Sequence, residues 1–190
     1  TVLDNLYRGG SSFVKLREKS GNYQLHDKIR DLVRKYVWDE RDPDKDTRRY
    51  LSRQMISYYH TRIGSEPDER EREVLQAERL YHEFYVDLET GYESFDRLFR
   101  EADNKRYISF CELLLGAAKM FRDEISKLHP DWDIFINVYD AWLNLKLNKL
   151  DVAGRVLKKS WKELENNGWH DRLDEVLNSL GYLARMQGDY

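Results

Sequence analysis

The sequence predicts a mainly α-helical protein, in which a short β-hairpin and one helix precede a series of helical hairpins. Three observations lead to this fold class. Only three prolines and ten glycines occur among the 190 residues, so little in the composition interrupts long helices. From Asp27 onward, apolar residues recur every three or four positions, the spacing that places them on one face of a helix. Aromatic residues make up 13% of the chain, which provides apolar surface for a core.

Residues 13–25 predict the β-hairpin. Two short stretches, 14–16 and 23–25, alternate apolar with polar or charged residues, as a strand with one buried face does. Between them lie Gly21 and Asn22, two residue types that tolerate the positive φ of a tight turn. The alternation and the turn together indicate two antiparallel strands.

An amphipathic helix is predicted over residues 27–37. Its apolar stripe is formed by Ile29, Leu32, Val33, Tyr36 and Val37. Asp27 stands at its start, where a carboxylate caps the first turn and interacts favourably with the positive end of the helix dipole. Residues 39–46, which read DERDPDKD, break this helical period and predict a solvated linker.

From residue 46 the chain reads as helices of ordinary length separated by short polar breaks. The first, over 46–63, carries four apolar residues on one side, namely Tyr50, Leu51, Met55 and Tyr58. Pro130 and Gly168 each mark the end of a helix, since proline cannot continue one and glycine readily terminates one. Helices joined by such short breaks are expected to pack as antiparallel neighbours.

Three segments of this region share a helix followed by a similar turn. Residues 177–190 read LNSLGYLARMQGDY, with Gly181 expected to let two helices approach closely and the turn at GDY. The turn recurs as NKL at 148–150, before the small residue Ala153, and as TGY at 90–92, before Ala102. These segments resemble degenerate tetratricopeptide repeats, with a spacing of about 40 rather than about 34 residues. The alternative is a generic helical bundle.

The two ends of the chain suggest a piece of a longer protein. Thr1 is not a start methionine, which indicates processing or excision. The last repeat is expected to be truncated, because its second helix would follow Tyr190.

The order of hairpin, helix and repeats resembles part of the STAND-class signalling ATPases of the NB-ARC type. In that family a Met-His-Asp or Leu-His-Asp signature lies near the end of a winged-helix domain, and here the residues are Leu25, His26 and Asp27. The resemblance assigns residues 1–40 to the end of the winged helix. It assigns residues 41–190 to the superhelical sensor that follows it, here an α-solenoid of tetratricopeptide-like helical hairpins.

The resemblance implies roles for two residues. His26 would contact the phosphates of ADP held by a neighbouring nucleotide-binding domain, and Asp27 would orient the loop and cap the helix. Without the resemblance, His26 reads as a surface residue beside a helix N-cap. The chain has no G-x-x-x-x-G-K-[ST] loop, so it is not expected to be an enzyme or to hold a cofactor itself. ADP or ATP would be bound by the presumed full-length protein.

The expected function is therefore that of a non-catalytic, cytoplasmic regulatory and sensor fragment of a signalling NTPase. Its expected partners are the nucleotide-binding domain of the same polypeptide and a protein or peptide bound to the repeats. No membrane association is expected, since no apolar run approaches the roughly 20 residues that cross a bilayer.

A winged-helix DNA-binding transcriptional regulator is the alternative function. Residues 1–37 hold eight basic and four acidic residues, a charge of +4 against −3 for the whole chain, which leaves −7 for the remainder. Lys28, Arg30 and Arg34 would then contact the phosphate backbone of DNA. A plain tetratricopeptide scaffold for protein interactions is a further alternative.

Other residues carry no predicted site. Cys111, the single cysteine, lies in an apolar helical stretch and is predicted to be a core residue; it excludes an internal disulfide and a cysteine-based zinc site. The histidines lack metal-ligand spacing. Four aromatic residues are predicted to be core rather than a partner surface: Trp132, Tyr139, Trp142 and Trp161.

Overall fold

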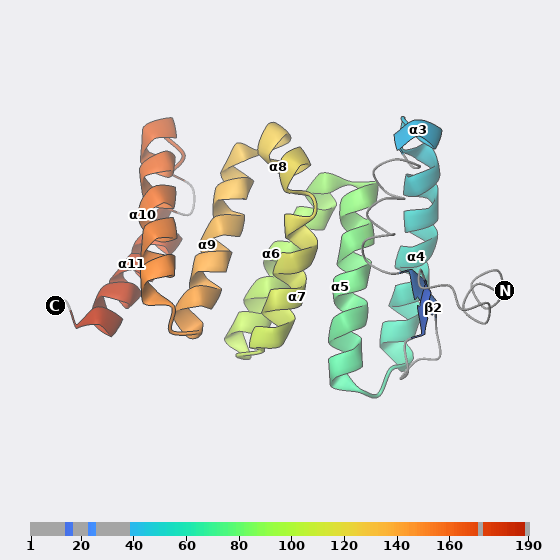
Figure 1. Ribbon diagram of the computed structural model, residues 1–190, viewed down its shortest axis with the longest axis horizontal. Helices are drawn as coiled ribbons and strands as arrows, with labels where there is room; N and C mark the ends of the chain where they lie inside the picture. The colour runs from blue at the N-terminus through green and yellow to red at the C-terminus, as the bar shows by residue number, and fades with distance from the viewer. Residues whose placement is uncertain (1–13, 17–22, 26–38, 171–172, 189–190) are drawn as a thin grey trace. The chain divides into compact units, whose positions relative to one another are not determined.

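The computed structural model describes the chain at residues 14–16, 23–25, 39–170 and 173–188 (Figure 1). This part of the chain is mainly α-helical, as the sequence predicts. It belongs to two compact units, Thr1–Arg49 and Tyr50–Tyr190. The division between the two units lies inside a helix. The domain boundary expected from the sequence follows residue 40, and it stays a prediction.

The first unit contains two short strands. Strand β1 (Val14–Leu16) pairs antiparallel with β2 (Tyr23–Leu25), so that Val14 lies opposite Leu25 and Leu16 opposite Tyr23. This pairing agrees with the alternation of apolar residues in both stretches. The helix predicted over residues 27–37 lies outside the described residues.

Most of the described side chains of residues 40–46 are exposed, as predicted for a solvated linker, but Asp42 among them is buried. Helix α3 (Asp39–Arg41) is followed by Asp42, which is only 6% exposed. The Asp42 carboxylate accepts hydrogen bonds from the main-chain N–H groups of Thr47 and Arg48, at 3.0 and 2.9 Å, and pairs with the Arg48 guanidinium at 3.2 Å. Burial alone would raise the pKa of Asp42, but these donors hold it below its ordinary value. A carboxylate that caps the next helix therefore orders this segment.

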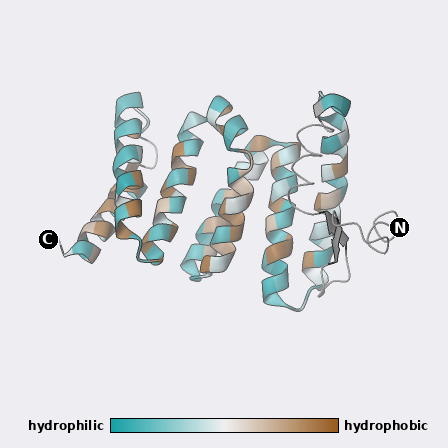
Figure 2. Cartoon of the chain, in the orientation of Figure 1, coloured by the Kyte–Doolittle hydropathy of each residue, from teal (hydrophilic) through white to brown (hydrophobic). Residues whose placement is uncertain are grey.

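Eight helices follow within the part of the chain that the structure describes. They are α4 (Asp46–Ser65), α5 (Glu69–Val86), α6 (Leu88–Asn104), α7 (Ile108–Lys119), α8 (Arg122–Leu128), α9 (Pro130–Lys146), α10 (Leu150–Asn167) and α11 (Leu173–Gln187). Helix α5 packs against α6 and α7, and α9 packs against α7, α8, α10 and α11. Helices α5–α11 carry both hydrophilic and hydrophobic residues (Figure 2), as expected for amphipathic helices that share a core.

The turn predicted at residues 90–92 is wrong, because these residues lie in the first turn of α6. The chain reverses instead at Asp87, which ends α5 in an extended conformation. The Asp87 carboxylate accepts a hydrogen bond from the main-chain N–H of Thr90 at 2.7 Å, which caps α6. The helix therefore begins at Leu88, before the glycine.

The predicted helix ends at Pro130 and Gly168 are confirmed. Helix α8 ends at Leu128, and Pro130 opens α9, where the missing N–H of proline costs no helical hydrogen bond. Gly168 follows α10 with a φ of 68°, a left-handed conformation that glycine adopts without steric cost.

Close helix packing within the described residues depends on Gly91. A Cβ atom added to Gly181 would meet nothing within 4 Å, so no described helix approaches Gly181 closely, and its predicted role stays a prediction. A Cβ atom on Gly91 would lie 2.6 Å from Cδ1 and 2.7 Å from Cα of Phe84. Gly91 thus lets α6 cross α5 almost in backbone contact.

The core comprises two clusters of buried side chains. One joins α5, α6, α7, α8 and α9 and contains Phe95, Phe99 and Tyr139; the other joins α9, α10 and α11. The aromatic residues predicted as core take part: Tyr139 is buried, while the half-buried Trp132, Trp142 and Trp161 pack against the clusters.

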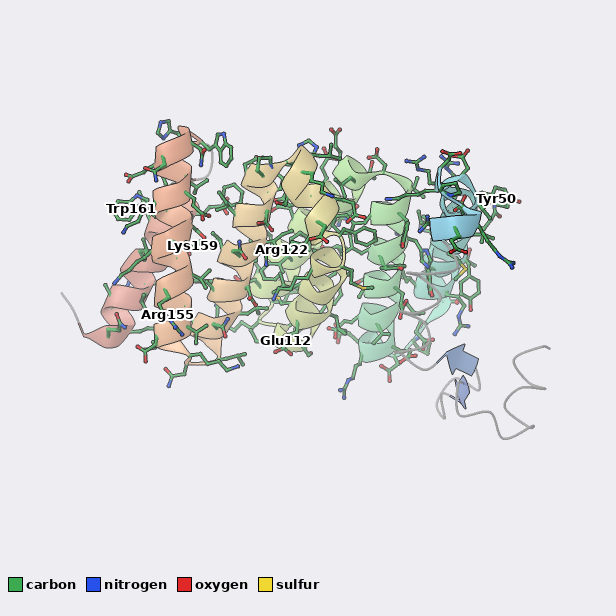
Figure 3. The ribbon with its side chains drawn as sticks, turned by 45° about the horizontal axis from the view of Figure 1, so that its top comes forward. Tyr50, Glu112, Arg122, Arg155, Lys159 and Trp161 are labelled. Atoms are coloured by element: carbon green, nitrogen blue, oxygen red, sulfur yellow. The ribbon has the colours of Figure 1, made fainter. Side chains whose placement is uncertain are left out.

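The apolar side of α4 is largely open to solvent. Tyr50, Leu51 and Tyr58 are 60%, 45% and 49% exposed, and Tyr50 projects outward in Figure 3. Helix α4 contacts α5 through Ser52 and Tyr59 instead, which meet His82. The helical period predicts that these apolar residues share one side of the helix, but it does not predict which side a neighbouring helix covers.

Candidate functional site

Helices α6, α9 and α11 run in the same direction (Figure 1). Residues of all three helices line one groove. The Tyr139 hydroxyl donates a hydrogen bond to Asp96, 43 residues earlier in the chain. The same offset of 43 residues separates Lys146 from Asp103, whose charged groups are 3.6 Å apart. Equivalent turns of α6 and α9 therefore lie side by side.

The groove has a volume of about 560 Å³, within the range of ligand-binding pockets in proteins. Phe99 and Arg100 contribute to the wall from α6, and Glu175 and Tyr182 to the wall from α11. Trp142 of α9 lies between these walls. The lining mixes aromatic, apolar and charged groups, which suits recognition of an amphipathic ligand.

Arg100 joins the two walls. Its guanidinium lies 2.9 Å from the Asp96 carboxylate on its own helix and 2.6 Å from the Glu175 carboxylate on α11. Partial burial alone would lower the pKa of Arg100, but the hydrogen bonds to Glu175 and Asp96 raise it above its ordinary value. Arg100 is thus a permanent cation that fixes α11 against α6.

Replacing this cation should loosen α11. Arg100→Met is expected to lower the free energy of unfolding by about 1 kcal/mol, since the side chain is half exposed and partly screened by solvent. The matched control is Arg97→Met, which removes only an exposed pair with Glu101 on the same helix, where about 0.3–0.5 kcal/mol is expected. Urea unfolding followed by circular dichroism measures both; equal losses would show that the link to α11 contributes nothing.

Two cations lie over aromatic rings that line the groove. The Lys146 ammonium lies 4.6 Å from the ring centre of Trp142, and the Arg185 guanidinium lies 5.9 Å from that of Tyr182. The two rings are 5.4 Å apart. Cation–π contacts of this kind hold charged groups in place without neutralising them, although Lys146 is also paired with Asp103.

Cys111 is a core residue, as predicted. Its side chain is fully buried, and its thiol lies 4.0 Å from the main-chain oxygen of Phe99. Burial, assisted by the nearby charge of Asp103, raises the pKa of the thiol to about 12. The thiolate needed for nucleophilic chemistry is therefore almost absent at neutral pH.

We expect the native chain to react with Ellman's reagent at least about 100-fold more slowly than the chain unfolded in guanidinium chloride. Because Cys111 is the single cysteine, the absorbance change reports this residue alone. Rapid reaction of the folded chain would contradict the burial of this thiol.

The site residues predicted from the sequence lie outside the described residues. This holds for His26 and Asp27 as nucleotide-sensing residues, and for Lys28, Arg30 and Arg34 as DNA contacts. The groove was not predicted, because no local pattern links residues that meet across gaps of 43 or 75 positions.

Two further properties concern the described residues alone. Their histidine, cysteine and acidic side chains form no group of three or more that could hold a metal ion. None of their helices combines the length and the apolar character that crossing a membrane requires. The chain matches no protein-family model, no curated protein and no solved structure.

Proposed function

We propose that this chain is the non-catalytic regulatory and sensor part of a cytoplasmic STAND-type signalling NTPase, and that helices α6, α9 and α11 bind a protein segment. The observation that carries the binding role is the groove, an open concavity of about 560 Å³ with aromatic and charged walls. Its polar groups are held in place by ion pairs between helices, as in a preformed binding site.

The constant offset of contacts between α6 and α9 supports the repeat architecture within this proposal. A spacing of 43 residues is close to the period of about 40 read from the sequence. Antiparallel helical hairpins stacked at a regular interval bring every second helix to the same face. If α7 and the short α8 together form the second arm of one hairpin, helices α6, α9 and α11 would be corresponding members of successive tetratricopeptide-like hairpins.

The nucleotide link rests on the front of the chain. Strands β1 and β2 pair antiparallel, as the wing of a winged helix would, and the Leu25-His26-Asp27 signature follows directly. An imidazole N–H donates to anionic phosphate oxygens, which suits His26 as a sensor of bound ADP. The nucleotide itself would be held by another domain, because the chain lacks a phosphate-binding loop.

The native transcript upstream of Thr1 tests this assignment. We expect it to encode a phosphate-binding loop and an acidic Walker-type strand. In the full-length protein, His26→Ala should then weaken ADP retention, measured by the nucleotide that remains after gel filtration. An upstream region without these motifs would refute the nucleotide link and leave a tetratricopeptide-like scaffold for protein binding.

DNA binding is the second candidate, favoured by the charge of +4 over residues 1–37. It requires duplex binding that weakens steeply with salt, because phosphate contacts release counterions. Alanine at Lys28, Arg30 and Arg34 should then abolish binding in a fluorescence anisotropy titration. Duplex binding that persists in this variant would exclude these three residues as the contact.

A further inference from the structure

We propose that one edge of the helical array docks on the surface of an anionic lipid membrane, without crossing it. The edge consists of the α6–α7 turn (105–107), the α9–α10 turn (147–149) and the end of α11 (185–188). We name it the cationic edge. This inference goes beyond the proposed function, which concerns nucleotide sensing and the groove.

The three segments form one continuous surface. Helices α6, α9 and α11 run in the same direction, so their C-terminal ends lie at the same edge, the lower one in Figure 1. Asp103, in the last turn of α6, lies 3.6 Å from Lys146, the last residue of α9. The ring of Trp142 lies 5.4 Å from that of Tyr182, which belongs to the last two turns of α11.

Every charged residue of the three segments is a cation. They are Lys105, Arg106, Lys149 and Arg185. All four are exposed, and none forms an ion pair within the part of the chain that the structure describes. The flanking acidic residues in the sequence are Asp103, Asp151 and Asp189. Asp103 is already paired with Lys146, and Asp189 lies outside the described residues. The edge therefore has an excess of available positive charge.

The opposite edge carries mainly acidic residues. Among them are Asp87, Glu89, Asp123, Glu124 and Asp131. Helix α9 runs from one edge to the other and has 17 residues, which makes it about 25 Å long. This length exceeds the screening length of about 8–10 Å at physiological ionic strength. The cationic edge can therefore attract an anionic surface although the whole chain carries a charge of −3.

Exposed apolar side chains lie at the same edge. Leu147 in the α9–α10 turn, Val152 in the first turn of α10 and Met186 at the end of α11 are 42%, 39% and 39% exposed. Membrane surfaces bind proteins by burying such side chains at the boundary between headgroups and acyl chains. Lysine and arginine next to them are attracted by anionic headgroups. The cationic edge combines both features.

A nucleic acid would account for the cations but not for the apolar residues. Proteins bind single-stranded nucleic acids through cations together with aromatic side chains on which bases stack. The one aromatic residue of the three segments is Tyr107, which is half-buried and whose hydroxyl donates a hydrogen bond to Glu69 at 3.0 Å. The edge therefore suits a lipid surface better. The expectation of no membrane association concerned spanning segments, and binding at the surface requires none.

Flotation of the 190-residue chain with vesicles tests this inference. We expect binding to phosphatidylcholine with about 30% phosphatidylserine that weakens with salt, and no binding to phosphatidylcholine alone. Lys149→Gln combined with Arg185→Gln should weaken binding at least about tenfold, since each cation near such a surface contributes about a factor of five. The matched control is Lys158→Gln with Lys162→Gln, two exposed positions of α10 more than two turns from the edge, which should bind like the wild type.

A dye at position 147 tests whether the apolar residues enter the membrane. Leu147→Cys is labelled with an environment-sensitive nitrobenzoxadiazole dye, and the fully buried Cys111 does not compete for the label. On binding, the dye emission should shift to shorter wavelength and be quenched by spin labels on the lipid acyl chains. The control is Leu128→Cys, at a 67% exposed position at the end of α8 on the opposite edge, where no change is expected.

The other outcomes contradict the inference. Equal binding to neutral and anionic vesicles would overturn it, as would full binding by the folded Lys149→Gln, Arg185→Gln variant or an unchanged dye at position 147 in bound chains. If the chain leaves vesicles unbound but binds a single-stranded oligonucleotide through the same two cations, the edge recognises nucleic acid instead. If it binds neither, the four cations only stabilise helix C-termini. Circular dichroism confirms that each variant is folded.

Discussion

Gly91→Ala should lower the free energy of unfolding by about 3 kcal/mol, near the upper end of the range for an overpacked site. The new Cβ atom would lie 2.7 Å from the Cα atom of Phe84, so a rotamer change cannot relieve the clash and α5 and α6 must separate. For a chain of this length the melting temperature should fall by about 6–12 °C. Thermal unfolding followed by circular dichroism measures the change.

The matched control is Gly116→Ala. Gly116 is an exposed position of α7, where an added Cβ atom meets nothing within 4 Å. Alanine should stabilise this helix by up to about 1 kcal/mol, because it loses less conformational entropy than glycine. A similar response of the two variants would contradict the close contact between α5 and α6.

The stability of the chain should also fall in mild acid because of His82. Burial lowers the pKa of this imidazole to about 4, from an ordinary value of 6.5. The unfolded chain takes up a proton as the pH falls below about 6.5, while the folded chain does not until about pH 4. The free energy of unfolding should therefore decrease across this window, by about 2 kcal/mol at pH 5 relative to pH 7.

His82→Gln isolates this contribution. The amide can keep the hydrogen bond to Ser52, which lies 3.2 Å from the imidazole, but it does not titrate. Between pH 7 and pH 5, urea titrations should show about 2 kcal/mol less loss of stability for this variant than for the wild-type chain. His60→Gln, at an exposed position of α4, should behave like the wild type. Parallel curves for all three proteins would exclude His82 as the titrating group.

Local chemistry explains which features could be predicted from the sequence. Pro130 and Gly168 act within one turn of the backbone, and the apolar surroundings of Cys111 are visible in its own helix. The turn predicted at residues 90–92 is wrong because the carboxylate of Asp87, three residues before Thr90, caps a helix that already begins at Leu88. The buried cap at Asp42 was missed because a run of charges usually faces solvent.

The groove depends on tertiary contacts and could not be predicted in this way. Helical periodicity identifies amphipathic helices, but several sides of α9 are in contact with neighbours. The link from Arg100 to Glu175 spans 75 residues, a separation for which a single sequence contains no pairing rule. The roles of His26 and Asp27 stay predictions, because those residues lie outside the described part of the chain.

The link between α6 and α11 also sets the moment at which the groove is completed during synthesis. The 75 residues between Arg100 and Glu175 take the ribosome roughly 4–15 s at about 5–20 residues per second. Until then α6 can pack on α5 and α7 but presents only one wall. A segment that recognises both walls would therefore bind chains in which α11 has been synthesised, and would not bind shorter nascent ones.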